Sequence, residues 1–106
     1  MSSMDERKKG FEAKFAHDAD LKFKAESRRN RMLAEWAASK MGLSEDATAE
    51  YIKDVRRADF EEAGDDDVFR KVKADLEARG ASIADAELRE KMDELIVKAV
   101  DEVENG

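Results

Sequence analysis

The best candidates for a functional site are basic and aromatic side chains between residues 22 and 36, and the function that suits them is binding. The candidates follow one another at spacings typical of a helix: Lys24, Arg28, Arg29, Arg31 and Trp36. Guanidinium and ammonium groups hold phosphates or an acidic protein surface, and an indole ring can stack on an adenine. The alternative is that the cations pair with the chain's own acids and that Trp36 packs in the core, which is the default for a tryptophan on an apolar stripe.

The sequence carries no recognisable catalytic or metal-binding motif. It has one histidine, no cysteine and no pairing of a nucleophile with a base. We interpret His17, which precedes the first expected helix, as a surface residue rather than as a pH sensor. An acidic run lacks the spacing of a calcium loop and is interpreted as a helix end and cap: Asp59, Glu61, Glu62, Asp65, Asp66 and Asp67. We therefore expect no enzyme, no metal site and no required cofactor.

The first 17 residues form a segment of different character. Phe11 and Phe15 are four residues apart, and Gly10 disfavours a stable helix by about 1 kcal/mol. We expect a flexible arm that becomes helical when its phenylalanines enter a groove on a partner, although both rings could instead fold back onto the rest of the chain. The candidate partner-binding residues of the arm are Met4, Lys8, Lys9, Phe11, Lys14 and Phe15.

Four helices are expected to position these side chains, separated at Gly42, Gly64 and Gly80. Their approximate bounds are 18–41, 45–63, 67–79 and 83–103. Ser44 is a good N-cap, and a glycine can take the left-handed conformation that ends a helix. Amphipathic helices joined by short turns predict an all-α fold, namely an irregular four-helix bundle over 18–106 with a flexible N-terminal arm over 1–17.

Apolar stripes at helical spacing identify the expected core. The first helix contributes Leu21, Ala25, Met32, Leu33, Trp36, Ala37 and Met41. The second contributes Ala47, Tyr51, Ile52, Val55, Ala58 and Phe60. The third contributes Val68, Phe69, Val72 and Leu76, and the last contributes Leu88, Met92, Leu95, Ile96, Ala99 and Val103.

The charge of the chain is unevenly distributed. Residues 1–31 carry nine basic and six acidic side chains, or +3, and residues 32–106 carry 11 and 21, or −10, which together return the net −7. A basic end on an acidic body can orient the molecule on a partner, whereas the acidic body argues against nucleic-acid binding. The absence of cysteine and of a long apolar run favours a cytoplasmic protein that does not insert into the membrane.

Four stretches of the chain resemble a known family. They are FEAKFAHD at 11–18, KAESRRNR at 24–31, WAASKMGLS at 36–44 and ADFEEAGDDDVFRKVKADL at 58–76. Together they are similar to the zeta subunit family, inhibitors of the F-type ATP synthase of alpha-proteobacteria. The sequence departs from that pattern at Ala19 and Glu35, where the family has acidic and apolar residues respectively.

The resemblance implies a function that the composition does not show. In the family, a four-helix bundle carries an N-terminal segment that enters a catalytic interface between alpha and beta subunits and blocks rotation in the hydrolysis direction. It also implies weak binding of ADP or ATP, which we would place at the basic cluster and Trp36. The protein would then lie in the cytoplasm, peripheral to the inner membrane through the ATP synthase.

Two other function classes remain open from the sequence. The chain could be an adenine-nucleotide-sensing helical binding module that uses the basic face of the first helix. It could also be a scaffold or adaptor bundle with a different partner. Binding of ADP with perturbation at 24–31 favours the first, and co-purification with a protein other than the synthase favours the second.

Overall fold

The computed structural model describes residues 19–59 and 65–105 of the chain. Within those ranges the fold is all-α and consists of four helices without a strand, as the sequence predicts. The arm predicted over 1–17 and the predicted core residue Phe60 lie outside the described residues.

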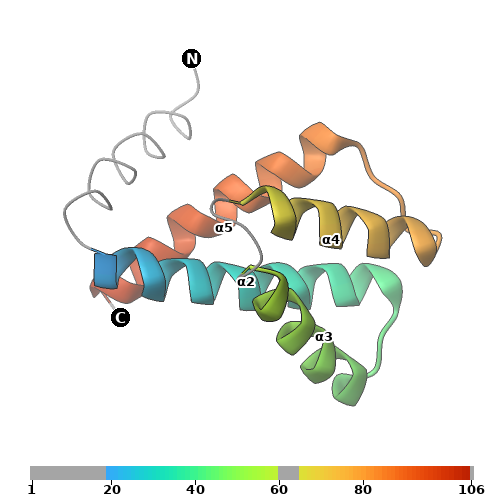
Figure 1. Ribbon diagram of the computed structural model, residues 1–106, viewed down its shortest axis with the longest axis horizontal. Helices are drawn as coiled ribbons and strands as arrows, with labels where there is room; N and C mark the ends of the chain where they lie inside the picture. The colour runs from blue at the N-terminus through green and yellow to red at the C-terminus, as the bar shows by residue number, and fades with distance from the viewer. Residues whose placement is uncertain (1–18, 60–64, 106) are drawn as a thin grey trace.

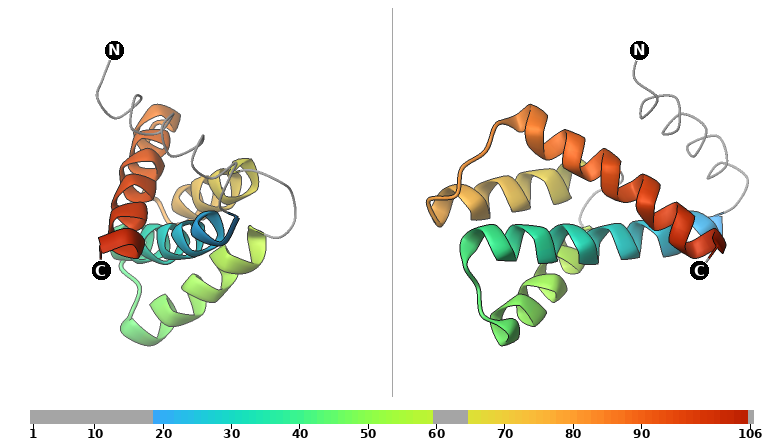
Figure 2. Two further views of the ribbon diagram at one scale, coloured as in Figure 1. Left: turned by 90° about the vertical axis from the view of Figure 1, so that its left-hand side faces the viewer. Right: turned by 180° about the vertical axis from the view of Figure 1, so that it is seen from behind.

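The longest helix, α2 (Ala19–Met41), is the centre of the bundle. It packs against α3 (Glu45–Ala58), α4 (Asp66–Ala78) and α5 (Asp85–Asn105). Helix α4 contacts all three of the others, whereas α3 and α5 have no mutual contact. Helices α2 and α5 run in opposite directions, so the end of α5 lies beside the first turn of α2 (Figures 1 and 2). The bundle is therefore irregular, with α2 packed against each of the other three helices.

Two glycines end helices by adopting backbone angles that other residues disfavour. Gly42 and Gly80 have φ of +71° and +72°. After Gly42, the backbone N–H of Leu43 donates to the Ala38 carbonyl at 3.0 Å. These reversals satisfy carbonyl groups at the ends of α2 and α4 and allow the chain to turn within a few residues.

Helix α3 begins at the expected cap and ends earlier than expected. The Ala47 backbone N–H donates to Ser44 Oγ at 3.2 Å, which satisfies one of the free donors of the first turn. Helix α3 ends at Ala58, whereas the sequence favoured an end near residue 63. Residues 60–64 lie outside the described residues.

Side chains of other helices contact the starts of the last two helices. We expected Asp65 to cap α4, but its carboxylate makes no side-chain cap bond and instead accepts from Arg29 of α2. Helix α5 begins at Asp85, two residues after the expected start at residue 83. Lys73 of α4 contacts this start, because its ammonium group donates to the Ile83 carbonyl and pairs with the Asp85 carboxylate at 3.1 Å.

The core consists of the apolar stripes of all four helices. Its central cluster joins Leu33 of α2, Val55 of α3, Val72 and Leu76 of α4, and Leu88 of α5. A smaller cluster joins α2 and α5 and contains Ala25, Ile96, Val97, Ala99 and Val100. Small side chains on α2 that the sequence analysis left out, including Ala34 and Ala38, are also buried and let the neighbouring helices approach closely. None of the helices in the described ranges is both long enough and apolar enough to cross a membrane.

Candidate functional site

Three of the predicted basic residues lie on the surface of α2, where acids already pair with them. Lys24 pairs with Asp20 at 3.0 Å within the helix. Arg31 pairs with Glu35 at 3.6 Å, and Arg28 reaches Glu102 of α5 at 3.4 Å. Exposed ion pairs of this kind contribute about 0–1 kcal/mol, so a partner's carboxylates or phosphates can replace the present acids. These three cations remain available for binding.

Arg29, in contrast, is buried and belongs to the architecture of the bundle. Its side chain is 1% exposed, with Nε donating to Asn30 Oδ1 at 2.8 Å and NH2 donating to Asp65 Oδ1 at 3.1 Å. Each residue of a helix is rotated by about 100° from the previous one, so Arg28 and Arg29 face different neighbours. The expected basic face thus loses one of its four cations, which instead binds α2 to the start of α4.

A cluster of acids surrounds the Arg29 guanidinium. Burial raises the pKa of Glu26, and the Asp59 and Asp65 carboxylates raise it further, while Arg29 opposes them. Burial also raises the pKa of Asp59, against the lowering effects of a hydrogen bond from Asn30 and of the Arg29 charge. One buried cation is thus shared among several carboxylates. The cluster joins α2 to the end of α3 and to the start of α4.

Asn30 and Glu26 also belong to this cluster, and neither was predicted from the sequence as a site residue. Asn30 is 2% exposed and links Arg29 to Asp59, although its side chain is polar and lies beside a run of cations. A signal was present, because Asn30, Ala34 and Ala37 share a helical face. Without the position of α3 and α4, however, that face is indistinguishable from a solvated one.

Trp36 lies where α2 meets α5, half-buried against the central core. The ammonium groups of Lys40 and Lys91 lie 5.1 Å and 5.6 Å from its ring centroid. Trp36 is roughly 10 Å along the helix from Arg29, at 1.5 Å per residue. Within 19–59 and 65–105, the cations over the indole are these two lysines, which do not belong to the predicted basic cluster.

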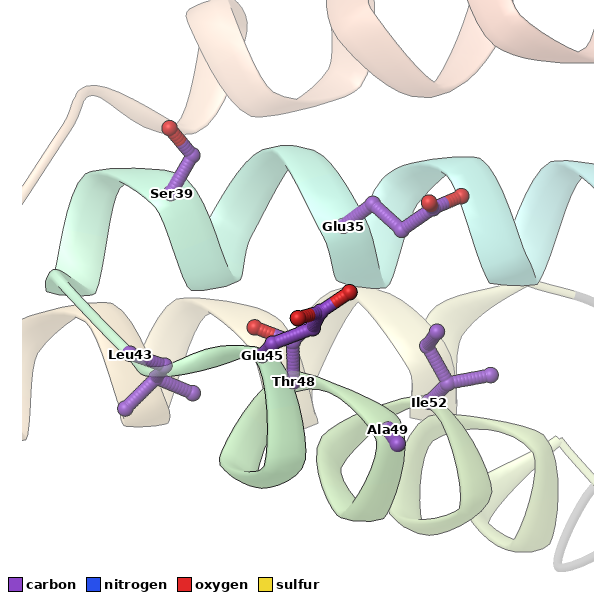
Figure 3. A pocket seen from close by; sticks show the side chains of 7 residues that line it. All are labelled: Glu35, Ser39, Leu43, Glu45, Thr48, Ala49 and Ile52. Atoms are coloured by element: carbon purple, nitrogen blue, oxygen red, sulfur yellow. The ribbon is translucent and has the colours of Figure 1, made fainter.

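An open groove lies between the second half of α2 and α3. Figure 3 shows the side chains that line it, which are Glu35, Ser39, Leu43, Glu45, Thr48, Ala49 and Ile52. Two carboxylates and no cation line this groove. Because carboxylates repel phosphate, the groove does not suit a nucleotide. No group of histidine or acidic side chains within the described ranges could hold a metal ion.

The predicted partner-binding residues of the arm fall outside the described residues: Met4, Lys8, Lys9, Phe11, Lys14 and Phe15. The structure does place the residue at which the arm meets the bundle. Ala19 begins α2 at the same end of the molecule as the last turn of α5 (Figure 2). A partner bound to the arm would therefore face this end of the bundle.

Comparisons with known proteins give a consistent result. A family model described as ATPase inhibitor subunit zeta matches residues 1–102. A solved structure, determined by solution NMR, is 40% identical in sequence and superposes with a TM-score of 0.70, covering 80% of this chain and 96% of its own. Among curated proteins no match is found.

Proposed function

Since this chain belongs to the family of the ATPase inhibitor subunit zeta, we propose the following mechanism by which it inhibits ATP synthase. The arm over 1–17 enters a catalytic interface between alpha and beta subunits of the F-type ATP synthase head. There it blocks rotation in the direction of ATP hydrolysis. The role is regulatory, and the bundle holds the arm in place.

The observation that supports this proposal is that the family match begins at residue 1 and includes both arm and bundle. The arm combines two phenylalanines with three lysines, which suits a cleft with an apolar floor and acidic walls. The exposed cations Lys24, Arg28 and Arg31 lie just after it on α2, where they extend the positive surface.

The charge distribution gives the bound molecule an orientation. The first 31 residues carry a net +3 and the remaining residues a net −10. An acidic cleft attracts the first part and repels the second, so the arm leads and the bundle stays outside. The protein would thereby be held in the cytoplasm at the inner membrane through the synthase, without contacting lipid itself.

Deleting residues 1–17 tests the proposal directly. ATP hydrolysis by the purified synthase is measured against increasing concentrations of the full chain, of the deletion variant and of Phe11→Ala/Phe15→Ala. We expect both variants to lose inhibition, because truncating a fully buried aromatic costs about 3–5 kcal/mol. Lys53→Ala, on an exposed face of α3, is the matched control and should inhibit normally. Full inhibition by the deletion variant would refute the proposal.

A second candidate function is adenine-nucleotide sensing, and the surroundings of Trp36 favour it. An adenine can replace one of the two ammonium groups that lie over the half-buried ring, and the lysines can then bind phosphate oxygens. Titration with ADP should quench the fluorescence of this single tryptophan, and Lys91→Ala should weaken the response severalfold. Chemical-shift changes confined to Lys24, Arg28 and Arg31 would instead place the ligand at the position expected from sequence.

A further inference from the structure

Phe23 is the one large apolar side chain that is exposed within the described ranges of the chain. It is 63% exposed, lies in the second turn of α2 and belongs to neither core cluster. A single exposed hydrophobic residue is common on protein surfaces and is not by itself a binding site. Its position relative to the arm and to the other helices is what distinguishes it.

The bundle leaves Phe23 uncovered because α2 is longer than its neighbours. Figure 1 shows the first turns of α2 extending past the ends of α3 and α4, with α5 beside them. Phe23 shares a helical face with Asn30 and Ala34, which are 2% and 0% exposed. Between Phe23 and Ala34 this face carries the polar residues Glu26, Ser27 and Asn30, so Phe23 is an isolated apolar side chain near the start of α2.

The spacing of aromatic residues continues from the arm into α2. Phe11, Phe15, Ala19 and Phe23 recur every four residues, and such positions form a continuous ridge on a helix. Ala19, between Phe15 and Phe23, is small enough to let a partner approach closely.

Charge around Phe23 indicates the chemistry of the surface that would cover it. Lys22 and Lys24 flank Phe23 and are exposed, and Arg28 lies one turn further on. Two of the acids near them, Asp20 and Glu102, pair with Lys24 and Arg28 only through exposed contacts that a partner can replace. A third acid, the half-buried Glu26, interacts electrostatically with Lys22. A pocket that suits this surface has an apolar centre and a rim of carboxylates.

We propose that Phe23 is a third apolar anchor, after Phe11 and Phe15, in the surface by which this chain binds the ATP synthase head. Phe23 enters an apolar pocket of the synthase head, rimmed by carboxylates, at the outer mouth of the cleft that receives the arm. This inference rests on the proposed function. It extends the binding surface from the arm onto the ordered bundle and gives α2 a direct role in holding the inhibitor.

The test compares Phe23→Ala and Phe23→Leu with the unmodified full chain. The concentration that gives half-maximal inhibition of ATP hydrolysis should rise about tenfold or more for Phe23→Ala, because the partner no longer buries the ring. Phe23→Leu keeps most of the apolar surface and should lose much less. Thermal unfolding should be unchanged in both variants, since the ring contributes little to the fold.

Several outcomes would overturn the inference. Unchanged inhibition by Phe23→Ala, combined with loss of inhibition on deleting 1–17, would leave the proposed function intact and remove Phe23 from the interface. A lowered unfolding temperature for Phe23→Ala would assign the ring to the fold. A change in the sedimentation of Phe23→Ala with unchanged inhibition would show that Phe23 contacts a second copy of the chain instead. If the deletion variant still inhibits fully, the proposed function itself fails.

Discussion

At the level of single residues, burial decides what a charge does in this protein. Arg29 is enclosed and donates to Asn30 and Asp65, so it holds helices together. Arg28, its neighbour in sequence, faces solvent and can exchange its partner Glu102. Removing one member of a buried pair leaves the other unpaired, which is more costly than losing an exposed pair. Enclosed and solvent-facing charges thus alternate along one helix.

The acids around Arg29 should make stability depend on pH. The pKa values of Glu26 and Asp59 are raised above their usual 4.5 and 3.8, so the folded state binds these protons more tightly than the unfolded state. Their contribution to stability is complete below the unfolded pKa values and is lost as pH rises through the folded ones. We expect the free energy of unfolding by urea to increase as pH falls from 7 toward 5.

Glu26→Gln isolates one of these acids. At pH 7 the variant should be more stable than the parent by about 0.5 kcal/mol, because it removes a half-buried negative charge near Asp59 and Asp65. Near pH 4 the Glu26 carboxyl of the parent is itself largely neutral, and the difference should disappear. A stability difference that stays constant between pH 7 and pH 4 would show that the charge of Glu26 is not responsible.

At the level of secondary structure, local sequence explains several helix ends, and side chains of other helices contact some of them. Gly42 and Gly80 end α2 and α4 through left-handed backbone, and Ser44 caps α3 as expected. Helix α5 starts two residues after the expected position, and Lys73 of α4 binds Asp85 and the Ile83 carbonyl there. Helix ends in this fold thus combine local capping with contacts between elements.

Gly80→Ala measures how much stability the left-handed backbone at the end of α4 costs a residue other than glycine. A methyl group at this position would meet no atom within 4 Å, so its cost is the left-handed backbone alone, about 1–2 kcal/mol. Gly80→Asn is the matched control, because asparagine tolerates this conformation and should lose less stability. Equal urea midpoints for Gly80→Ala and the parent would contradict the assigned conformation.

At the level of the whole molecule, α2 connects every other helix of the bundle. It packs against α3, α4 and α5, while α3 and α5 do not contact each other. The residue at which the arm meets the bundle, Ala19, is also the first residue of this central helix. Force applied by a bound arm would thus be transmitted to α2 before it reaches any other part of the bundle.

This arrangement predicts a gradient of local stability. Amides of α2 around Leu33, Ala34 and Ala37 should exchange with solvent only through global unfolding, since their side chains are fully buried. Amides near Lys53 in α3, which contacts only α2 and α4, should exchange through smaller openings. Native-state hydrogen exchange followed by NMR measures both sets. Equal opening free energies in α2 and α3 would refute the gradient.

The sequence alone was sufficient to predict the all-α fold, the presence of four helices and most of the core. These features depend on contacts between residues three or four apart and on the backbone preferences of Gly42, Ser44 and Gly80, which are local. The family resemblance, carried by residues such as those at 11–18 and 58–76, was also readable without a structure, and the family match over 1–102 confirms it.

Only the tertiary structure decided which polar residues are buried and which apolar residue is exposed. Arg29 meets Asp65 across 36 positions, and Arg28 meets Glu102 across 74. No local pattern specifies such pairs, because they depend on how the helices cross. The arrangement of the helices also explains the exposure of Phe23, because α3 and α4 end before they reach the first turns of α2 (Figure 1).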